Sequence, residues 1–311
     1  MTSLLERRLV LVTGKGGVGK STCAAALALA AVRRRKRVLL AELSARSVAL
    51  DLLGVHGVTH VATEAAPETL PGLFVAHLDA HQALTEYLSE LLGVPRLVHL
   101  ATENRILARL WQAAPSVAEM AVLNALYQHE RAQGRGGGPR FDLIVVDMPA
   151  TGHALQTLTV PKGALGMIRV GSLAERAHEI DLLLHDRRRT AVCIVTLPEE
   201  LPINEAVQLA TKLHANLQIE TSHVVINRIL PSLFDPAERA LLDRLSTSGR
   251  VGEGQALIDA VQPNQDRHQG QLARIESLKQ RIAAQFIEVK ELARRGVGLV
   301  EAVAVTLGEA G

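Results

Sequence analysis

The stretch Gly14-Lys15-Gly16-Gly17-Val18-Gly19-Lys20-Ser21 follows an apolar run, residues 9–12, and opens into an alanine-rich run that begins at Thr22. This order predicts a strand, a glycine-rich turn and a helix. The spacing matches G-x-x-x-x-G-K-[ST], in which glycines let backbone N–H groups surround a phosphate chain at a helix N-terminus. We therefore expect Lys20 to reach the β- and γ-phosphates of ATP and the Ser21 hydroxyl to bind Mg²⁺. The residues expected to contact the nucleotide here are Gly14, Gly16, Gly17, Val18, Gly19, Lys20, Ser21 and Thr22.

The composition of the 311 residues indicates a large globular unit with an aliphatic core. Hydrophobic residues make up 48% of the chain and aromatic residues only 2%, so Leu, Val, Ile and Ala must fill the core. The net charge of +2 argues against a nucleic-acid partner. Cys23 and Cys193 lie far apart in apolar runs, as buried thiols in a reducing compartment do. We see no signal peptide and no apolar run near the ~18 residues of a membrane span. We therefore expect a cytoplasmic protein, and a peripheral place at the inner face of a membrane stays open.

Two apolar runs end in a carboxylate. Val38–Glu42 and Phe141–Asp147 read as buried parallel strands, and ligands of doubly wound sheets bind at the carboxyl ends of such strands. Asp147 is therefore expected to hold Mg²⁺ through water, as the acid at the end of a Walker B strand does. Glu42 is expected near the phosphates, although a helix-capping or surface role is an open alternative. Asp51 is a weaker substitute for Glu42.

The hydrophobic periodicity predicts a doubly wound α/β fold with a mostly parallel sheet, and the phosphate loop assigns it to the P-loop NTPase class. Residues 1–311 form one domain in this interpretation, and residues 80–135 form an inserted helical subdomain. Further strands are expected at 73–79, 166–171, 191–197 and 223–227. Residues 246–271 are expected to be rich in loops, and residues 272–295 to form an amphipathic helix with Phe286 on its apolar face. A last helix is expected at 297–307.

Lys15 gives the loop a more specific form. Lys-Gly-Gly-x-Gly-Lys-Ser resembles the deviant Walker A sequence of ATPases that act as nucleotide-sandwich dimers. The run Asp-Met-Pro-Ala-Thr-Gly-His, residues 147–153, resembles switch II of one branch, the arsenite-pump (ArsA) and tail-anchored-protein-targeting ATPases. Segments 115–119, 196–205 and 224–231 also resemble elements of that family, the last of them its adenine loop. The chain is thus similar to the bacterial single-domain members.

The resemblance implies the roles of several residues. Lys15 would act on the nucleotide of a second subunit, so a chain with one phosphate loop would work as a homodimer. Glu42, where better-known members have Asp, would orient the attacking water. Gly152 would let switch II approach the γ-phosphate. Asn227 and its neighbour Arg228 would contact the adenine, because an amide offers both a donor and an acceptor. The implied cofactors are ATP and Mg²⁺.

The cargo stays open at this point. We see no cysteine cluster for a metalloid and no Cys-x-x-Cys for zinc, and Met120 is the one methionine of the helical segment. The pairs His56/His60 and His77/His81 lack the Glu of a His-Glu-x-x-His helix.

One hypothesis for the function is an ATP-driven carrier of hydrophobic segments or membrane proteins. A second is the ATPase subunit of an anion pump, and a third is a nucleotide-switched regulator like the partition and division-site ATPases, against which the switch II sequence argues.

Overall fold

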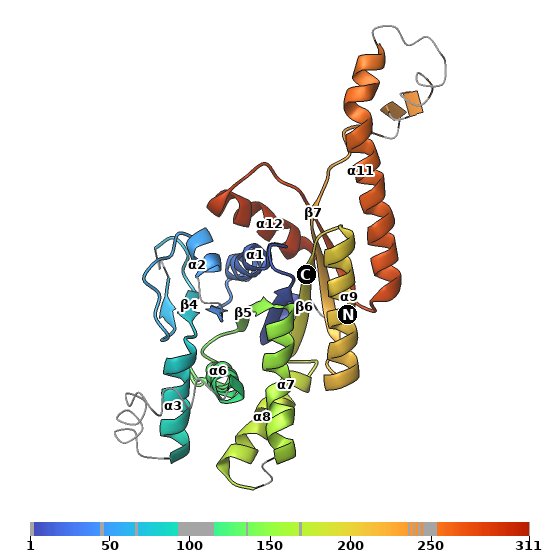
Figure 1. Ribbon diagram of the computed structural model, residues 1–311. Helices are drawn as coiled ribbons and strands as arrows, with labels where there is room; N and C mark the ends of the chain where they lie inside the picture. Colours follow the sequence, from blue (N-terminus) through green and yellow to red (C-terminus); the bar gives the residue numbers. More distant parts are fainter. Residues whose placement is uncertain are drawn as a thin grey trace.

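The computed structural model describes residues 3–43, 47–65, 68–92, 115–134, 136–167, 170–235 and 254–310, with positions 237, 238, 240, 241 and 244. Its eight-stranded sheet has the order β3-β4-β2-β5-β1-β6-β7-β8, and every neighbouring pair in it except β3 with β4 is parallel (Figure 1). The strands are β1 (Leu9–Gly14), β2 (Val38–Glu42), β3 (Thr63–Glu64), β4 (Leu73–His77), β5 (Leu143–Ala150), β6 (Thr190–Thr196), β7 (Thr221–Ile229) and β8 (Gln285–Lys290). The fold class expected from the sequence is confirmed.

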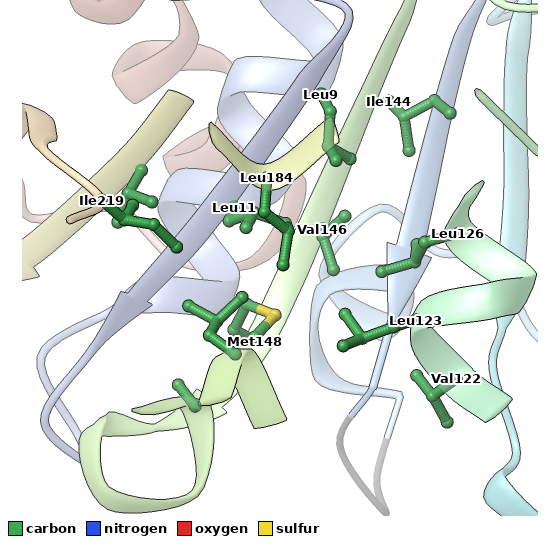
Figure 2. Packing of buried hydrophobic residues seen from close by; sticks show 14 of the residues in the cluster. Leu9, Leu11, Val122, Leu123, Leu126, Ile144, Val146, Met148, Leu184 and Ile219 are labelled. Carbon is green, nitrogen blue, oxygen red and sulfur yellow. The ribbon is translucent and has the colours of Figure 1, made fainter. Parts of the chain in front are cut away.

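Helices cover both faces of the sheet. The described helices are α1 (Lys20–Arg33), α2 (Val48–Leu52), α3 (Ala80–Leu92), α6 (Pro115–Arg131), α7 (Thr151–Met167), α8 (Ser172–His185), α9 (Glu200–Lys212), α11 (Gly254–Arg281) and α12 (Gly296–Ala310), with a 3₁₀ turn η1 (Leu4–Glu6) and a π turn η2 (Leu213–Leu217). Successive strand residues point to opposite faces, so both sets must be apolar to be buried. In β1, Val10 and Val12 pack with α1, α2 and α12, whereas Leu9 and Leu11 pack with the helices of the other face. Figure 2 shows part of this second layer, and the residues labelled there are aliphatic apart from Met148.

The carboxyl ends of β2, β5, β1 and β6 meet at one edge of the sheet. Glu42 is the register partner of Asp147, and Gly14 pairs with Ala150 on one side and Val195 on the other. The central position of β1 places the glycine-rich turn between the ends of β5 and β6. This edge therefore collects the residues that the sequence singles out.

One predicted strand is wrong. Within residues 166–171, Gly166 and Met167 end α7, and Gly171, with φ +96°, precedes α8. The apolar letters suggested a buried strand, yet Met167 is 80% and Val170 86% exposed. Residues 168–169 lie outside the described ranges. Glycine at both ends of a short apolar run marks two helix termini here rather than a strand.

The C-terminal third also departs from prediction. The helix predicted over 272–295 ends at Arg281, and Phe286 belongs to β8. Ile282 and Phe286 are four residues apart, a spacing that places residues on one face of a helix and also on one face of a strand. Residues 254–271, expected to be loop, form the first part of α11, which extends beyond the rest of the molecule in Figure 1. A polar, largely exposed helix carries no apolar stripe for a sequence pattern to reveal.

The other expected elements are present. Strands cover most of 73–79, 191–197 and 223–227, and α12 covers 297–307. Between β4 and β5 the described residues hold α3 and α6, while residues 93–114 lie outside the description. The subdomain boundaries at 80 and 135 therefore stay a prediction. Over the described part of the chain, no helix combines the length and the apolar character needed to cross a membrane.

Candidate nucleotide-binding site

Two glycines of the loop are required by their surroundings. Gly14 has φ +148°, and a Cβ there would lie 2.1 Å from the carbonyl oxygen of Val195 on β6. Gly19 has φ +94°, and a Cβ there would lie 2.3 Å from the amide nitrogen of Asn227. A side chain at either position would be strained and would clash with its neighbour. The turn is thus wedged between β6 and the end of β7, and α1 begins directly after it.

Ser21 and Asp147 form the polar pair at the start of α1. The Ser21 hydroxyl donates a hydrogen bond of 2.6 Å to Oδ2 of Asp147. The other carboxylate oxygen, Oδ1, is buried and has no hydrogen-bond partner among the described residues. Burial raises the pKa of Asp147, while Ser21 and Lys20 act in the opposite direction. A hydroxyl beside a buried, half-satisfied carboxylate is an oxygen-rich donor set that suits Mg²⁺.

Lys20 lies across the loop. Its ammonium donates a 3.0 Å hydrogen bond to the carbonyl of Lys15. Burial lowers the pKa of Lys20, and the nearby Asp147 carboxylate opposes that shift. The side chain therefore closes the loop on itself and stays within the field of the buried acid, as expected of a phosphate-binding lysine.

The side chain of Lys15 leaves the loop. Its ammonium donates a 2.7 Å hydrogen bond to Oε1 of Glu205 on α9. Two lysines five positions apart in one loop thus have different partners. Glu205 lies in segment 196–205, which the sequence comparison singled out only as a family element.

Glu42 is fully buried at the end of β2. Its Oε1 accepts a 2.6 Å hydrogen bond from the backbone N–H of Ala49 in the first turn of α2, and its Oε2 has no partner among the described residues. Burial, joined by the charge of Asp147, raises the pKa of Glu42 to about 7 against the effect of the Ala49 N–H. The helix-capping contact is therefore present, and it uses only one of the two carboxylate oxygens. Asp51 lies on the surface, 3.3 Å from His56.

Switch II, residues 147–153, runs from the end of β5 into the first turn of α7. Gly152 is the second residue of α7, and open space surrounds its Cα. Nδ1 of His153 lies 3.7 Å from Oε1 of Glu119 on α6. Glu119 is only 6% exposed, and neither of its oxygens has a hydrogen-bond partner within the described ranges. A buried carboxylate without such a partner is costly, so this contact calls for an explanation.

A cavity of about 310 Å³ lies at this contact. Its wall joins the carboxyl ends of β2, β4 and β5 to α3, α6 and α7. It is formed by Leu43, His77, Leu78, Asp79, Ala80, Ala118, Glu119, Val122, Pro149, His153 and Thr157. Leu43 directly follows Glu42, and Pro149 lies two residues after Asp147. The cavity thus connects switch II with the first turns of α3 and α6.

Asn227 braces the loop from the end of β7. Its side-chain N–H₂ donates a 2.9 Å hydrogen bond to the carbonyl of Val18, and its side-chain oxygen accepts one of 3.0 Å from the N–H of Arg228. Arg228 has φ +56°, a left-handed conformation that is uncommon for a residue with a side chain. Both polar atoms of the Asn227 amide thus already have a partner within the protein. The adenine contact expected of Asn227 stays a prediction.

A second cavity, of about 470 Å³, opens beside Asn227 and Arg228. Thr22 borders it on the loop side, and the segment after β8 closes it from the other side with Lys290, Glu291, Leu292, Arg294, Arg295, Gly296 and Leu299. The sequence interpretation missed this segment because it placed residues 272–295 in a helix. The alternation of buried Ile287 and Val289 with exposed Glu288 and Lys290 was the available signal for a strand that ends here.

The cysteines and the histidine pairs lie elsewhere. Both cysteines are buried, and burial raises the pKa of Cys23 to about 12 and also raises that of Cys193. His60 lies 3.3 Å from Glu86, and His77 lies 3.3 Å from the Ser47 hydroxyl. Over the described residues, no group of three acidic, histidine or cysteine side chains is arranged to hold a metal.

Comparison with known proteins agrees with this geometry. The model of the anion-transporting ATPase family (ArsA) matches residues 7–172 and 167–241. The chain belongs to this family. It is 29% identical over 261 residues to the ATPase BagA of Mycobacterium tuberculosis, covering 82% of this chain and 72% of that protein. It is 31% identical over 214 residues to an arsenical pump-driving ATPase of Escherichia coli, covering 67% of this chain and 32% of the relative. It is 26% identical over 281 residues to the ATPase GET3C of Arabidopsis thaliana, covering 74% and 69%. The chain is accordingly an ATPase, as the phosphate loop predicted.

Proposed function

We propose that this ATPase works as a homodimer that couples MgATP binding and hydrolysis to the handling of an apolar protein segment. The observation that carries the proposal is the contact between His153 of switch II and the buried Glu119 of α6. It links the nucleotide edge to the helices that lie between β4 and β5. A chain that only hydrolysed ATP would have no need of a carboxylate buried at that joint.

The chemistry follows from the residues at the edge. Lys20 and the backbone N–H groups of the loop bind the phosphates, and Ser21 and Asp147 hold Mg²⁺. The bound ion supplies neutralisation of the charge on the β- and γ-phosphates. Glu42, through its unpartnered Oε2, accepts a hydrogen bond from the attacking water. The base lies in the 470 Å³ cavity beside Asn227, and Lys15 acts on the nucleotide of the second subunit.

Through the contact between His153 and Glu119, switch II can act on helices that lie away from the nucleotide. His153 is the third residue of α7 and Glu119 the fifth residue of α6, so a shift of switch II moves one helix relative to the other. Arg176, the fifth residue of α8, donates to Glu90 of α3 at 2.6 Å and to Asn124 of α6 at 3.0 Å. These bonds hold α3, α6 and α8 together, so the helices respond as one unit.

An apolar surface lies at the far end of that unit. Met167, Val170 and Leu173, which we call the tip cluster, are 80%, 86% and 37% exposed at the junction of α7 and α8. The Arg176–Glu90 bond places the junction beside the last turns of α3. Exposed apolar side chains that gather at one place mark an interaction site more often than scattered ones do. The tip cluster is therefore our candidate contact for an apolar cargo segment.

The test uses a soluble reporter protein that ends in a single apolar helix of about 20 residues. Binding is measured with a non-hydrolysable ATP analogue and with ADP. We expect binding in one nucleotide state, and a loss of about tenfold or more for Met167→Asp. The matched control is Leu201→Asp, at a 60% exposed leucine of α9. Equal binding by both variants and the wild type would exclude the tip cluster.

The same binding assay also tests the contact between His153 and Glu119. Glu119→Gln keeps the shape of the side chain and removes its charge, so turnover should persist while the difference between the two nucleotide states shrinks. If the difference is retained, switch II acts by another route.

The names of the arsenical pump-driving relatives favour a second candidate, the ATPase subunit of an anion pump. That candidate predicts no reporter binding in either state and an ATPase rate stimulated by an oxyanion.

A further inference from the structure

Lys15 and Glu205 are 190 positions apart in the chain and meet at the rim of the phosphate loop. Their side chains are 27% and 31% exposed, so the ion pair is partly shielded from water. Glu205 is firmly held, because its neighbours Ile203, Ala206 and Leu209 anchor α9 in the core. The loop residue thus reaches out to a carboxylate that a packed helix keeps in place.

The main chain of Lys15 is fixed independently of its side chain. Its carbonyl accepts the ammonium of Lys20, which keeps the loop closed whatever the Lys15 side chain does. Lys20 also already supplies a cation to the chain's own loop. The Lys15 ammonium is therefore free to exchange one anion for another without any change in the loop.

We propose that Glu205 is a positioning residue for Lys15: in a single subunit it holds the ammonium against α9, and it yields the ammonium to the phosphates bound by a second copy of this chain. The inference rests on the proposed function, since it requires Lys15 to act across a dimer. A single carboxylate in a partly exposed pair is a weak partner, whereas a phosphate chain carries several negative charges. The transfer of the Lys15 ammonium from Glu205 to phosphate is thus favoured only when a second subunit with bound nucleotide is present.

The contact has a measurable consequence for dimer formation. Each subunit must break its Lys15–Glu205 pair before the closed state forms, which raises the protein concentration needed for turnover. Exposed pairs of this kind change an equilibrium by roughly two- to fivefold each. We expect Glu205→Gln to lower the half-maximal protein concentration for ATP hydrolysis by about that factor for each pair. The kcat at saturating protein and the KM for ATP should stay unchanged.

The matched control is Glu200→Gln, an exposed glutamate one and a half turns earlier on the same helix. It should leave the concentration dependence as in the wild type. A second measurement avoids turnover altogether. In dilute, nucleotide-free protein, acylation of Lys15 by an acetyl N-hydroxysuccinimide ester is followed by mass spectrometry, with exposed Lys212 as internal reference. Glu205→Gln should speed the acylation of Lys15 relative to Lys212 by a similar factor.

Each outcome has one meaning. Faster Lys15 acylation together with a lower half-maximal concentration is the expected result. A variant in which neither readout moves overturns the positioning role, and so does one in which KM rises or kcat falls, because Glu205 would then contact the nucleotide. Lys15→Ala separates this from the proposed function. If that variant hydrolyses ATP with unchanged rate and concentration dependence, the action of Lys15 across a dimer fails first.

Discussion

The nucleotide edge has two ends that are assembled in different ways. At the phosphate-loop end, eight consecutive residues supply most of the expected phosphate contacts, and two distant acids, Asp147 and Glu205, bond to their side chains. At the other end, Asn227 and Arg228 follow β7, while the facing wall comes from the segment after β8, more than 60 positions further along the chain. The residues of the first end come mainly from one continuous stretch of the sequence. The second exists only after β7 and β8 have paired.

This difference decides what each end depends on. The loop end rests on side chains with single partners, such as Ser21 with Asp147 and Lys20 with the Lys15 carbonyl. The β7–β8 end is an open hollow of about 470 Å³ with several exposed cations on its rim. We expect single substitutions to be severe at the loop end and graded at the other, and the predictions below test that contrast.

The largest effect is expected at Lys20. Lys20→Ala removes the cation that faces the phosphates, and loss of one such charge-stabilising donor lowers turnover by about a thousandfold. Steady-state hydrolysis at saturating ATP measures it. Lys20→Met, which keeps much of the stem, should be equally inactive if the charge is what matters, and thermal unfolding should show that both variants stay folded. Substantial turnover in Lys20→Met would contradict the assignment of the loop.

The same contrast explains which residues of the site could be predicted from the sequence. The loop, Asp147 and the parallel strands that carry them follow from residues that are adjacent in the chain, and the structure brings Ser21 and Asp147 together as expected. Glu119 and Glu205 were visible only as letters in family-like segments. Their partners, His153 and Lys15, lie 34 and 190 positions away, and only packing of the helices brings them into contact.

The C-terminal third was hard to predict for a related reason. The strand β8 is an edge strand with one apolar face, and its spacing from Ile282 also fits a helix. Residues 259–270 of α11 are exposed or half-buried, so little burial imposes a period on this part of the sequence. Where tertiary contacts are few, the pattern of apolar residues says little about the secondary structure.

A smaller effect is expected at Glu42, which joins the loop end to α2. Its pKa is about 7 in the folded protein against an unfolded value near 4.5, because burial disfavours the charged form. The folded state thus binds more protons between these values, so the contribution of Glu42 to stability falls as pH rises from 4.5 to 7. A pKa shift of this size corresponds to about 3 kcal/mol at most, and solvent screening leaves a contribution of about 2–3 kcal/mol.

Glu42→Gln should remove that pH dependence, because an amide oxygen can still accept the Ala49 N–H. Relative to the wild type, the nucleotide-free variant should gain about 2–3 kcal/mol in free energy of unfolding between pH 4.5 and pH 7.5. Denaturant unfolding at the two pH values measures the difference. The exposed Asp51 supplies the control, since Asp51→Asn should change little between them. A Glu42→Gln variant whose stability tracks the wild type at both pH values would mean that Glu42 stays ionised in the folded protein.

The smallest effect is expected at Asn227, where the two ends of the edge touch. Asn227→Ala leaves the Val18 carbonyl and the Arg228 N–H without their side-chain partners, at a cost of about 1–2 kcal/mol in the free energy of unfolding. Asn227→Asp keeps the acceptor for Arg228 but places a buried carboxylate oxygen against the Val18 carbonyl, so it should be at least as destabilising as the alanine variant. Because Val18 belongs to the loop, the KM for ATP should rise a few-fold while kcat changes less. If kcat instead falls as steeply as for Lys20→Ala, the two ends act as one unit and the contrast between them is lost.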